Sequence, residues 1–78
     1  MNMHVTISGL LPEAFLRIKE DLDPSHWLKG YHIDEDGLYT VELEDYVILK
    51  KNSDKLWLDC GAHLSDLNQD EFVEVKII

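Results

Sequence analysis

The segment YHIDEDGLYTVEL, residues 31–43, decides the fold because two strand-like patterns flank an acidic turn. A three-residue loop over residues 35–37, with Gly37 left-handed, places Ile33 opposite Tyr39 and keeps the apolar side chains on one face. A two-residue loop would instead place apolar residues opposite polar ones. We therefore predict an antiparallel hairpin with the three-residue loop.

The residues before this hairpin predict one amphipathic helix over about residues 12–22. Pro12 suits the first helical position, and Asp23-Pro24 ends the helix and caps a further short turn through Trp27. Upstream, Met3–Ile7 alternates apolar and polar residues, which predicts a strand that Gly9 ends. The helix presents one apolar stripe, made of Leu11, Ala14, Phe15, Ile18 and Leu22.

A second hairpin is predicted after the first, with strands over residues 46–50 and 55–60 and a polar four-residue turn between them. Its register pairs Leu49 with Leu56. A continuous strand through the junction would turn Asp45 inward, and burying an unpaired carboxylate is costly, so we predict a bend there; a functional buried acid is the alternative. One face then holds Val47, Leu49, Leu56 and Leu58, and the other holds Tyr46, Ile48 and Trp57.

The remaining residues predict one short helical turn, packed by Leu64 and Leu67, and a closing strand over Val73–Ile77. Residues 1–78 thus form a single α+β domain with the order β-α-β-β-β-β. We expect a mostly antiparallel sheet with the helix on one face.

Charge is the strongest compositional signal, since sixteen acidic residues stand against seven basic ones, for a net charge of −9. Direct binding to nucleic acid or to an anionic membrane is disfavoured, and a basic protein is attracted. No stretch is apolar enough to span a membrane, and the first residues lack the pattern of a signal peptide. Because Cys60 is a lone cysteine, we expect a reducing compartment, the cytoplasm.

The residues that could carry chemistry do not form a recognisable catalytic or metal-binding set. The serines lie at turns or helix starts, the glycines are dispersed, and no paired Cys or His spacing is present. We predict no enzyme, no cofactor and no metal site. Asp59, Cys60 and His63 are close in sequence, so a small metal-binding or thiol protein built on Cys60 and His63 is an alternative.

Two surface features indicate binding. The first is an acidic set on the first hairpin, where like charges repel unless solvent or a partner relieves them. The plainer interpretation is a solvated sheet face, and the functional one is a docking surface for a basic protein groove, including imitation of nucleic-acid phosphates. The set comprises Asp34, Glu35, Asp36, Glu42, Glu44 and Asp45.

The second feature is an apolar anchor formed by Tyr46, Ile48 and Trp57, which is exposed if the helix covers the opposite face of the second hairpin. The alternative is a curled hairpin whose trio packs beneath residues 61–71 or Trp27.

The sequence therefore predicts a non-enzymatic acidic protein-binding module, a small regulator or inhibitor of a basic protein partner, with nucleic-acid-binding proteins as one class of such partners. A self-associating module is the alternative, because a terminal strand at a sheet edge pairs readily with a second copy to give a homodimer.

Overall fold

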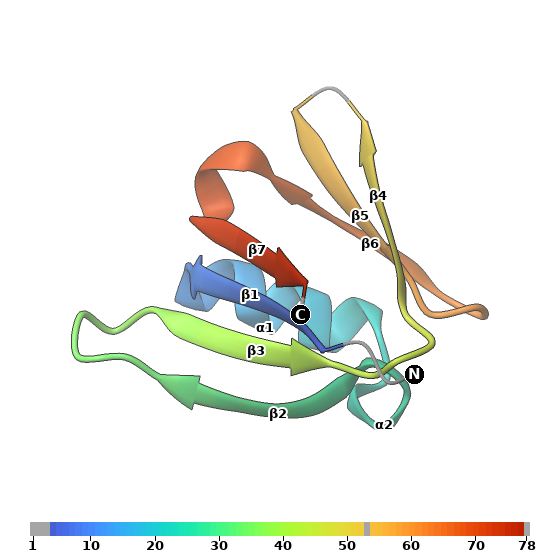
Figure 1. The fold of residues 1–78 in the computed structure, drawn as a ribbon, viewed down its shortest axis with the longest axis horizontal. Coiled ribbons are helices and arrows are strands. Elements are labelled where there is room, and N and C mark those ends of the chain that lie inside the picture. Colours follow the sequence, from blue (N-terminus) through green and yellow to red (C-terminus); the bar gives the residue numbers. More distant parts are fainter. Residues whose placement is uncertain (1–3, 53, 78) are drawn as a thin grey trace.

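The structure, a computed structural model, describes residues 4–52 and 54–77, in which seven strands form two antiparallel sheets (Figure 1). Sheet A has the strand order β2-β3-β1-β7, and sheet B has the order β4-β5-β6. The α+β class is confirmed, and the chain order roughly matches the predicted β-α-β-β-β-β, with seven strands in place of five. The strands are β1 (Val5–Leu10), β2 (Leu28–Ile33), β3 (Tyr39–Leu43), β4 (Ile48–Asn52), β5 (Lys55–Asp59), β6 (Leu64–Asn68) and β7 (Glu74–Ile77).

The predicted helix is confirmed as α1 (Pro12–Asp21), which begins with a proline in its first turn. The predicted extra turn is α2 (Pro24–Trp27), whose N-terminus is capped where the Ser25 N–H donates to Asp23 Oδ1 at 3.0 Å. Both helices end in extended residues, so the chain passes directly into β2.

The core lies between the two sheets and α1. In Figure 1, α1 lies behind sheet A, and sheet B stands at an angle to sheet A on the side of β7. Phe15 of α1 stacks on Tyr39 of sheet A with ring centroids 4.3 Å apart, and α1 also contacts β6 of sheet B. Each fully buried aliphatic side chain contributes about 1.5–3 kcal/mol, so this shared core stabilises the packing of both sheets. Its largest fully buried members are Trp27, Ile7, Leu10, Ile18, Leu22, Leu43, Leu58, Leu67 and Val41.

The first hairpin has the predicted register. Ile33 pairs with Tyr39, and Gly37 is left-handed with φ of 82°. The Gly37 N–H donates to the carbonyl of Asp34 at 2.9 Å, which closes the turn. Tyr31 and Tyr39 contact Phe15 of α1, whereas Ile33 is exposed.

The prediction that Gly9 ends the first strand is wrong, because β1 continues through Gly9 to Leu10. Gly9 has φ of 67°, and the pairing between β1 and β3 shifts between Ile7 and Leu10, so the glycine forms a bulge inside the strand. A Cβ at this position would collide with the side chain of Val73. The predicted first residue of this strand, Met3, lies outside the described residues.

The predicted bend at the junction of the hairpins is confirmed. The Val47 N–H donates to the carbonyl of Glu44 at 3.1 Å, which closes a turn, and Asp45 lies outside the core with Lys29 Nζ 2.7 Å from its carboxylate. Asp45 is therefore not a buried functional acid.

The register predicted for the second hairpin is wrong by two residues. Leu49 pairs with Leu58 instead of Leu56, and Asn52 pairs with Lys55, so the turn is shorter than predicted. Because side chains alternate with a period of two, this shift keeps the predicted faces unchanged. Leu49 and Leu58 still face the core.

The predicted helical turn at Leu64 and Leu67 is also wrong, because these residues belong to strand β6. Ser65 and Leu67 face the core, while Leu64 faces outward. Ser65 is only 2% exposed, and its hydroxyl donates to Asp21 at 2.9 Å. The closing strand is β7, which begins at Glu74 and not at the predicted Val73.

The 3-10 helix η1 (Gln69–Glu71) joins β6 to β7 and is fixed to α1 by an ion pair. Arg17 donates from Nη1 and Nη2 to the two carboxylate oxygens of Glu71 at 2.7 and 2.8 Å, and Nη2 also donates to the carbonyl of Asp66 at 2.8 Å. Glu71 Oε1 further accepts from the Asn68 N–H at 2.8 Å. Glu71 therefore serves the fold as a partly buried, fully bonded carboxylate.

Candidate protein-binding surface

The acidic residues predicted as one surface lie along the first hairpin in two groups. Asp34, Glu35 and Asp36 form the tip, while Glu44 and Asp45 lie at the other end of β3. At about 3.3 Å per residue, the six residue-to-residue steps from Leu38 to Glu44 separate the two groups by about 20 Å. The six carboxylates therefore form a strip along the hairpin.

Glu42 lies between the two groups, on the face of sheet A that points away from α1. It pairs with Thr6 of β1 and with Gly30 of β2, where the missing side chain leaves a shallow hollow of about 200 Å³. This hollow is open to solvent, and its lining residues are Thr6, Gly30, Tyr31, His32, Thr40, Val41 and Glu42.

The positive groups beside the strip are mostly histidines. His32 Nε2 lies 3.1 Å from Asp34, and His4 Nδ1 lies 2.9 Å from Glu42. Each of these two contacts is an ion pair only while its histidine is protonated. Glu35 and Glu44 make no ion pair with a described residue.

Lys29 is the one lysine that binds the strip among the described residues. Its hydrogen bond to the carboxylate lowers the pKa of Asp45, and the same bond raises the pKa of Lys29. Both side chains are on the surface, where such a pair contributes little stability. Its clearest effect is to orient the turn that leads into β4.

Two members of the predicted apolar anchor, Ile48 and Trp57, lie on the outer face of sheet B, which no described element covers. The third, Tyr46, lies in the turn that leads into β4. Tyr46 and Ile48 are 53% and 55% exposed, and Trp57 is half-buried between Lys50 and Asp66 on its neighbouring strands. The Lys55 ammonium lies 5.8 Å from the centroid of the Trp57 ring, within range of a cation–π contact. The trio is thus not packed beneath residues 61–71, and Trp27 lies in the core.

Sequence reasoning missed a fourth apolar side chain on this face. Leu64 is 57% exposed, and its strand position is opposite Asp59, which in turn is opposite Ile48. The signal was obscured because the buried Ser65 interrupts the apolar alternation of β6. We use the name anchor face for Tyr46, Ile48, Trp57 and Leu64.

Most of the charges that border the anchor face are acidic, although Lys50 is opposite Trp57 and Lys55 Nζ lies 3.2 Å from the carboxylate of Asp66. Asp59 lies between Ile48 and Leu64, Asp66 is opposite Trp57, and Glu44 is close enough to Tyr46 to affect its phenol. Partial burial raises the pKa of Tyr46, and the negative charge of Glu44 raises it further. This arrangement of exposed apolar groups with an acidic border is suited to recognition of a protein surface.

Cys60 and His63 are joined by a tight turn and do not form a thiol–imidazole pair. The Cys60 N–H donates to the carbonyl of His63 at 3.1 Å, and the thiol lies 3.4 Å from that same oxygen. Within residues 4–52 and 54–77, no three His, Cys, Asp or Glu side chains gather in a way that could hold a metal ion.

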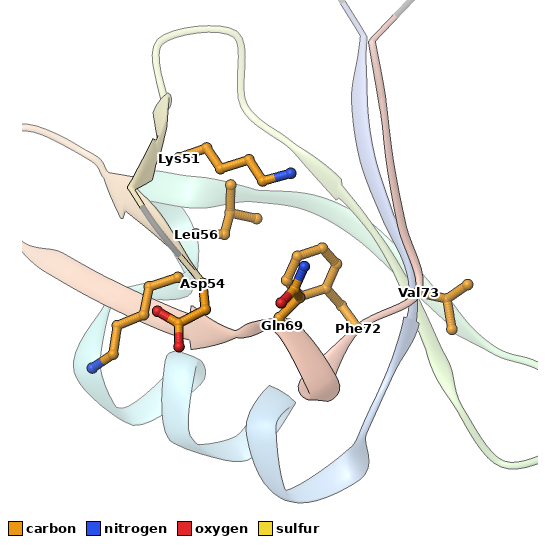
Figure 2. A pocket seen from close by; sticks show the side chains of 7 residues that line it. Lys51, Asp54, Leu56, Gln69, Phe72 and Val73 are labelled. Carbon is orange, nitrogen blue, oxygen red and sulfur yellow. The ribbon is translucent and has the colours of Figure 1, made fainter.

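A groove separates the two sheets beside β7. It comprises adjoining hollows of about 140 and 400 Å³ that share Lys51, Leu56, Phe72 and Val73 in their walls. Figure 2 shows Lys51 and Leu56 on the side of sheet B, Phe72 below them, and Val73 pointing away from the hollow. The second hollow extends along β7 to Val75 and along β4 to Leu49.

No protein-family model, curated protein or solved structure matches this chain. Among the described residues, no helix has the length and apolar character needed to cross a membrane.

Proposed function

We propose that this chain is a non-enzymatic acidic protein-binding module that docks on a basic protein through the anchor face. The observation that carries this proposal is the uncovered outer face of sheet B together with the turn before β4, where Tyr46, Ile48 and Leu64 are each more than half exposed and Trp57 is half-buried. A chain this small buries only a limited apolar core, yet these apolar side chains lie on its surface. Such side chains contribute binding energy once a partner excludes water from them.

The acidic strip supplies the long-range part of the recognition. A net charge of −9 attracts a basic protein and speeds its association, and the carboxylates on the first hairpin orient the encounter. A basic groove that binds nucleic acid is the surface such a strip fits best, because the carboxylates then occupy the places of backbone phosphates. By covering that groove, the module would act as a regulator or inhibitor, and the lone Cys60 is consistent with its acting in the cytoplasm.

The test is a pull-down from nuclease-treated source-cell lysate, followed by association kinetics with the retained protein. Ile48→Ala combined with Leu64→Ala should raise the dissociation rate about tenfold or more, because an anchor side chain contributes more than about 1 kcal/mol. Leu16→Ala is the matched control, since Leu16 is 56% exposed on the solvent side of α1.

The charge arm of the same experiment uses Asp34→Lys with Asp36→Lys. This variant should slow association by about tenfold at low salt and reduce the salt dependence of the rate. Glu13→Lys with Glu20→Lys changes the net charge equally but lies on α1, so it should have a smaller effect. Equal retention and equal rates for all variants would contradict the proposal.

A further inference from the structure

Four strands lie at the edges of the two sheets, and three of them are protected against pairing with another chain. β4 carries adjacent lysines, Lys50 and Lys51, which place like charges on both faces of that edge. β2 is distorted by a register shift between Leu28 and Gly30. At β6, α1 lies alongside, and Arg17 bonds to the carbonyl of Asp66.

β7 is short and carries Glu74 and Lys76, but it has no register shift in its pairing with β1. It pairs only with β1, in the register of Ile7 with Val75 and Thr6 with Lys76, so its backbone groups on the other side have no strand partner among the described residues. Beside it lies the groove of about 400 Å³, whose walls include Val73, Glu74 and Val75. The short sequence Glu74-Val75-Lys76-Ile77 contains one residue of each charge.

We propose that two copies of this chain associate by antiparallel pairing of β7 with β7 of the partner, centred on Val75. In an antiparallel pair, side chains that are opposite each other lie on the same face of the sheet. When the two strands are identical and related by a twofold axis, this requires that one residue lies at the axis, opposite the same residue of the partner. Centring on Glu74 or on Lys76 would oppose like charges. Centring on Val75 opposes Glu74 to the partner's Lys76 twice, and this register alone among the three is complementary in charge.

The same register is favourable on the inner face. Val75 meets the partner's Val75 at the mouth of the groove, next to the apolar walls formed by Leu49, Leu56 and Phe72. The outer face carries the two Glu–Lys pairs in solvent. Because only four residues of each β7 take part, the interface is small and the association is weak.

Salt separates this association from the proposed partner binding. Two copies that each carry a charge of −9 repel one another, so salt should strengthen the dimer by screening that repulsion. Binding of a basic partner should instead weaken with salt. The two surfaces also differ, since the dimer uses the edge of sheet A and the partner uses the anchor face of sheet B.

The experiment is sedimentation equilibrium over micromolar to millimolar chain in about 0.5 M NaCl, where the Debye length is only about 4 Å. The wild-type chain should shift from 9.1 kDa towards twice that mass as concentration rises. Glu74→Lys and Lys76→Glu should each weaken self-association at least tenfold, since each opposes like charges across the twofold axis. Lys50→Glu, on the edge of β4, is the control and should dimerise as well as or better than wild type.

The decisive arm mixes the two weakened variants. When Glu74→Lys chains are mixed with Lys76→Glu chains, each lysine of one chain is opposite a glutamate of the other. The mixture should therefore form a heterodimer, although neither variant forms a homodimer. Urea unfolding of each variant confirms that both remain folded. A monomeric wild type at all concentrations, undiminished dimers in the single variants, or no heterodimer in the mixture would each overturn the proposal.

Discussion

Glu71 and Arg17 form the ion pair that joins α1 to the segment between β6 and β7. The hydrogen bond from Arg17 lowers the pKa of Glu71, outweighing the opposite effect of burial, and the Asn68 N–H lowers it further. Replacing Glu71 leaves Arg17 and the Asn68 N–H without their acceptor, while Arg17 stays partly solvated. The pair is therefore a local contribution to stability that can be measured by substitution.

We expect Glu71→Gln to lower the free energy of unfolding by about 1–2 kcal/mol, the loss typical of a charged hydrogen bond that is partly screened by solvent. Glu20→Gln on the exposed side of α1 is the control and should change stability little. Urea unfolding followed by circular dichroism measures both. Equal stability of the two variants would contradict the structural role of Glu71.

The pH dependence has a defined sign. The folded pKa of Glu71 lies below its usual value of 4.5, so the folded state binds fewer protons there than the unfolded state does. The advantage of wild type over Glu71→Gln should therefore be complete above pH 4.5 and disappear as the pH falls through the lower folded pKa. An advantage that persists unchanged in stronger acid would show that the ion pair is not its cause.

At the scale of elements, the bulge at Gly9 brings β1 into close contact with Val73, the residue before β7. Gly9 has a left-handed backbone and lies directly against the Val73 side chain, while Gly37 is equally left-handed but has open space around it. This contrast allows the cost of backbone conformation to be separated from the cost of contact.

We expect Gly37→Ala to cost about 1 kcal/mol for the left-handed backbone alone. Gly9→Ala should cost about 1–3 kcal/mol more, because the new methyl group collides with Val73. Adding Val73→Ala to Gly9→Ala should recover part of that excess, which a double-mutant cycle in urea measures. Equal losses for the two glycine variants would argue against close packing of Val73 on β1.

The elements that the sequence predicted correctly are those whose local signals agree with one another. In the first hairpin, Gly37 and the apolar alternation select the same loop. In the second, the alternation cannot distinguish registers that differ by two residues, because both keep Leu49 and Leu58 on the inner face. The tighter register places Lys51 on the inner face opposite Leu56, where its aliphatic stem lines the groove.

The candidate surface was predictable only in part. Ile48 and Trp57 follow from the alternation of β4 and β5, while Tyr46 lies in the turn before β4. Leu64 does not follow from such a pattern, because Ser65 takes a buried position by bonding to Asp21 at the end of α1. The division of the acidic strip into two groups depends on the length of β3, and the groove depends on the angle between the sheets. These features come from tertiary packing, which a local pattern does not encode.

At the scale of the whole molecule, the excess of carboxylates opposes the compact state. Sixteen acids against seven bases repel one another more strongly when they are brought together by folding. Several carboxylates, including Glu35 and Glu44, have no ion pair with a described residue to offset this. Stability should therefore respond to ionic strength.

We expect the free energy of unfolding to rise by about 1 kcal/mol between low salt and about 0.5 M NaCl, because the Debye length shortens to a few ångströms. A variant with Asp34→Asn, Glu35→Gln and Asp36→Asn should have a higher free energy of unfolding than wild type at low salt. Its free energy of unfolding should also rise less when salt is added. Thermal unfolding at low micromolar concentration measures both while limiting dimer formation. A larger gain for the variant than for wild type would contradict the assignment of repulsion to the hairpin tip.

The position of β1 in sheet A also governs how the chain can fold. The β2–β3 hairpin and the three-stranded β4–β5–β6 meander each pair strands that are neighbours in sequence. Each can form as soon as it is synthesised. β1 is the first strand to emerge, yet it completes its pairing only with β7, the last of the seven. Closing that long loop is the slow, non-local step, so we expect the two sheets to be locally structured before the central strand is locked in place.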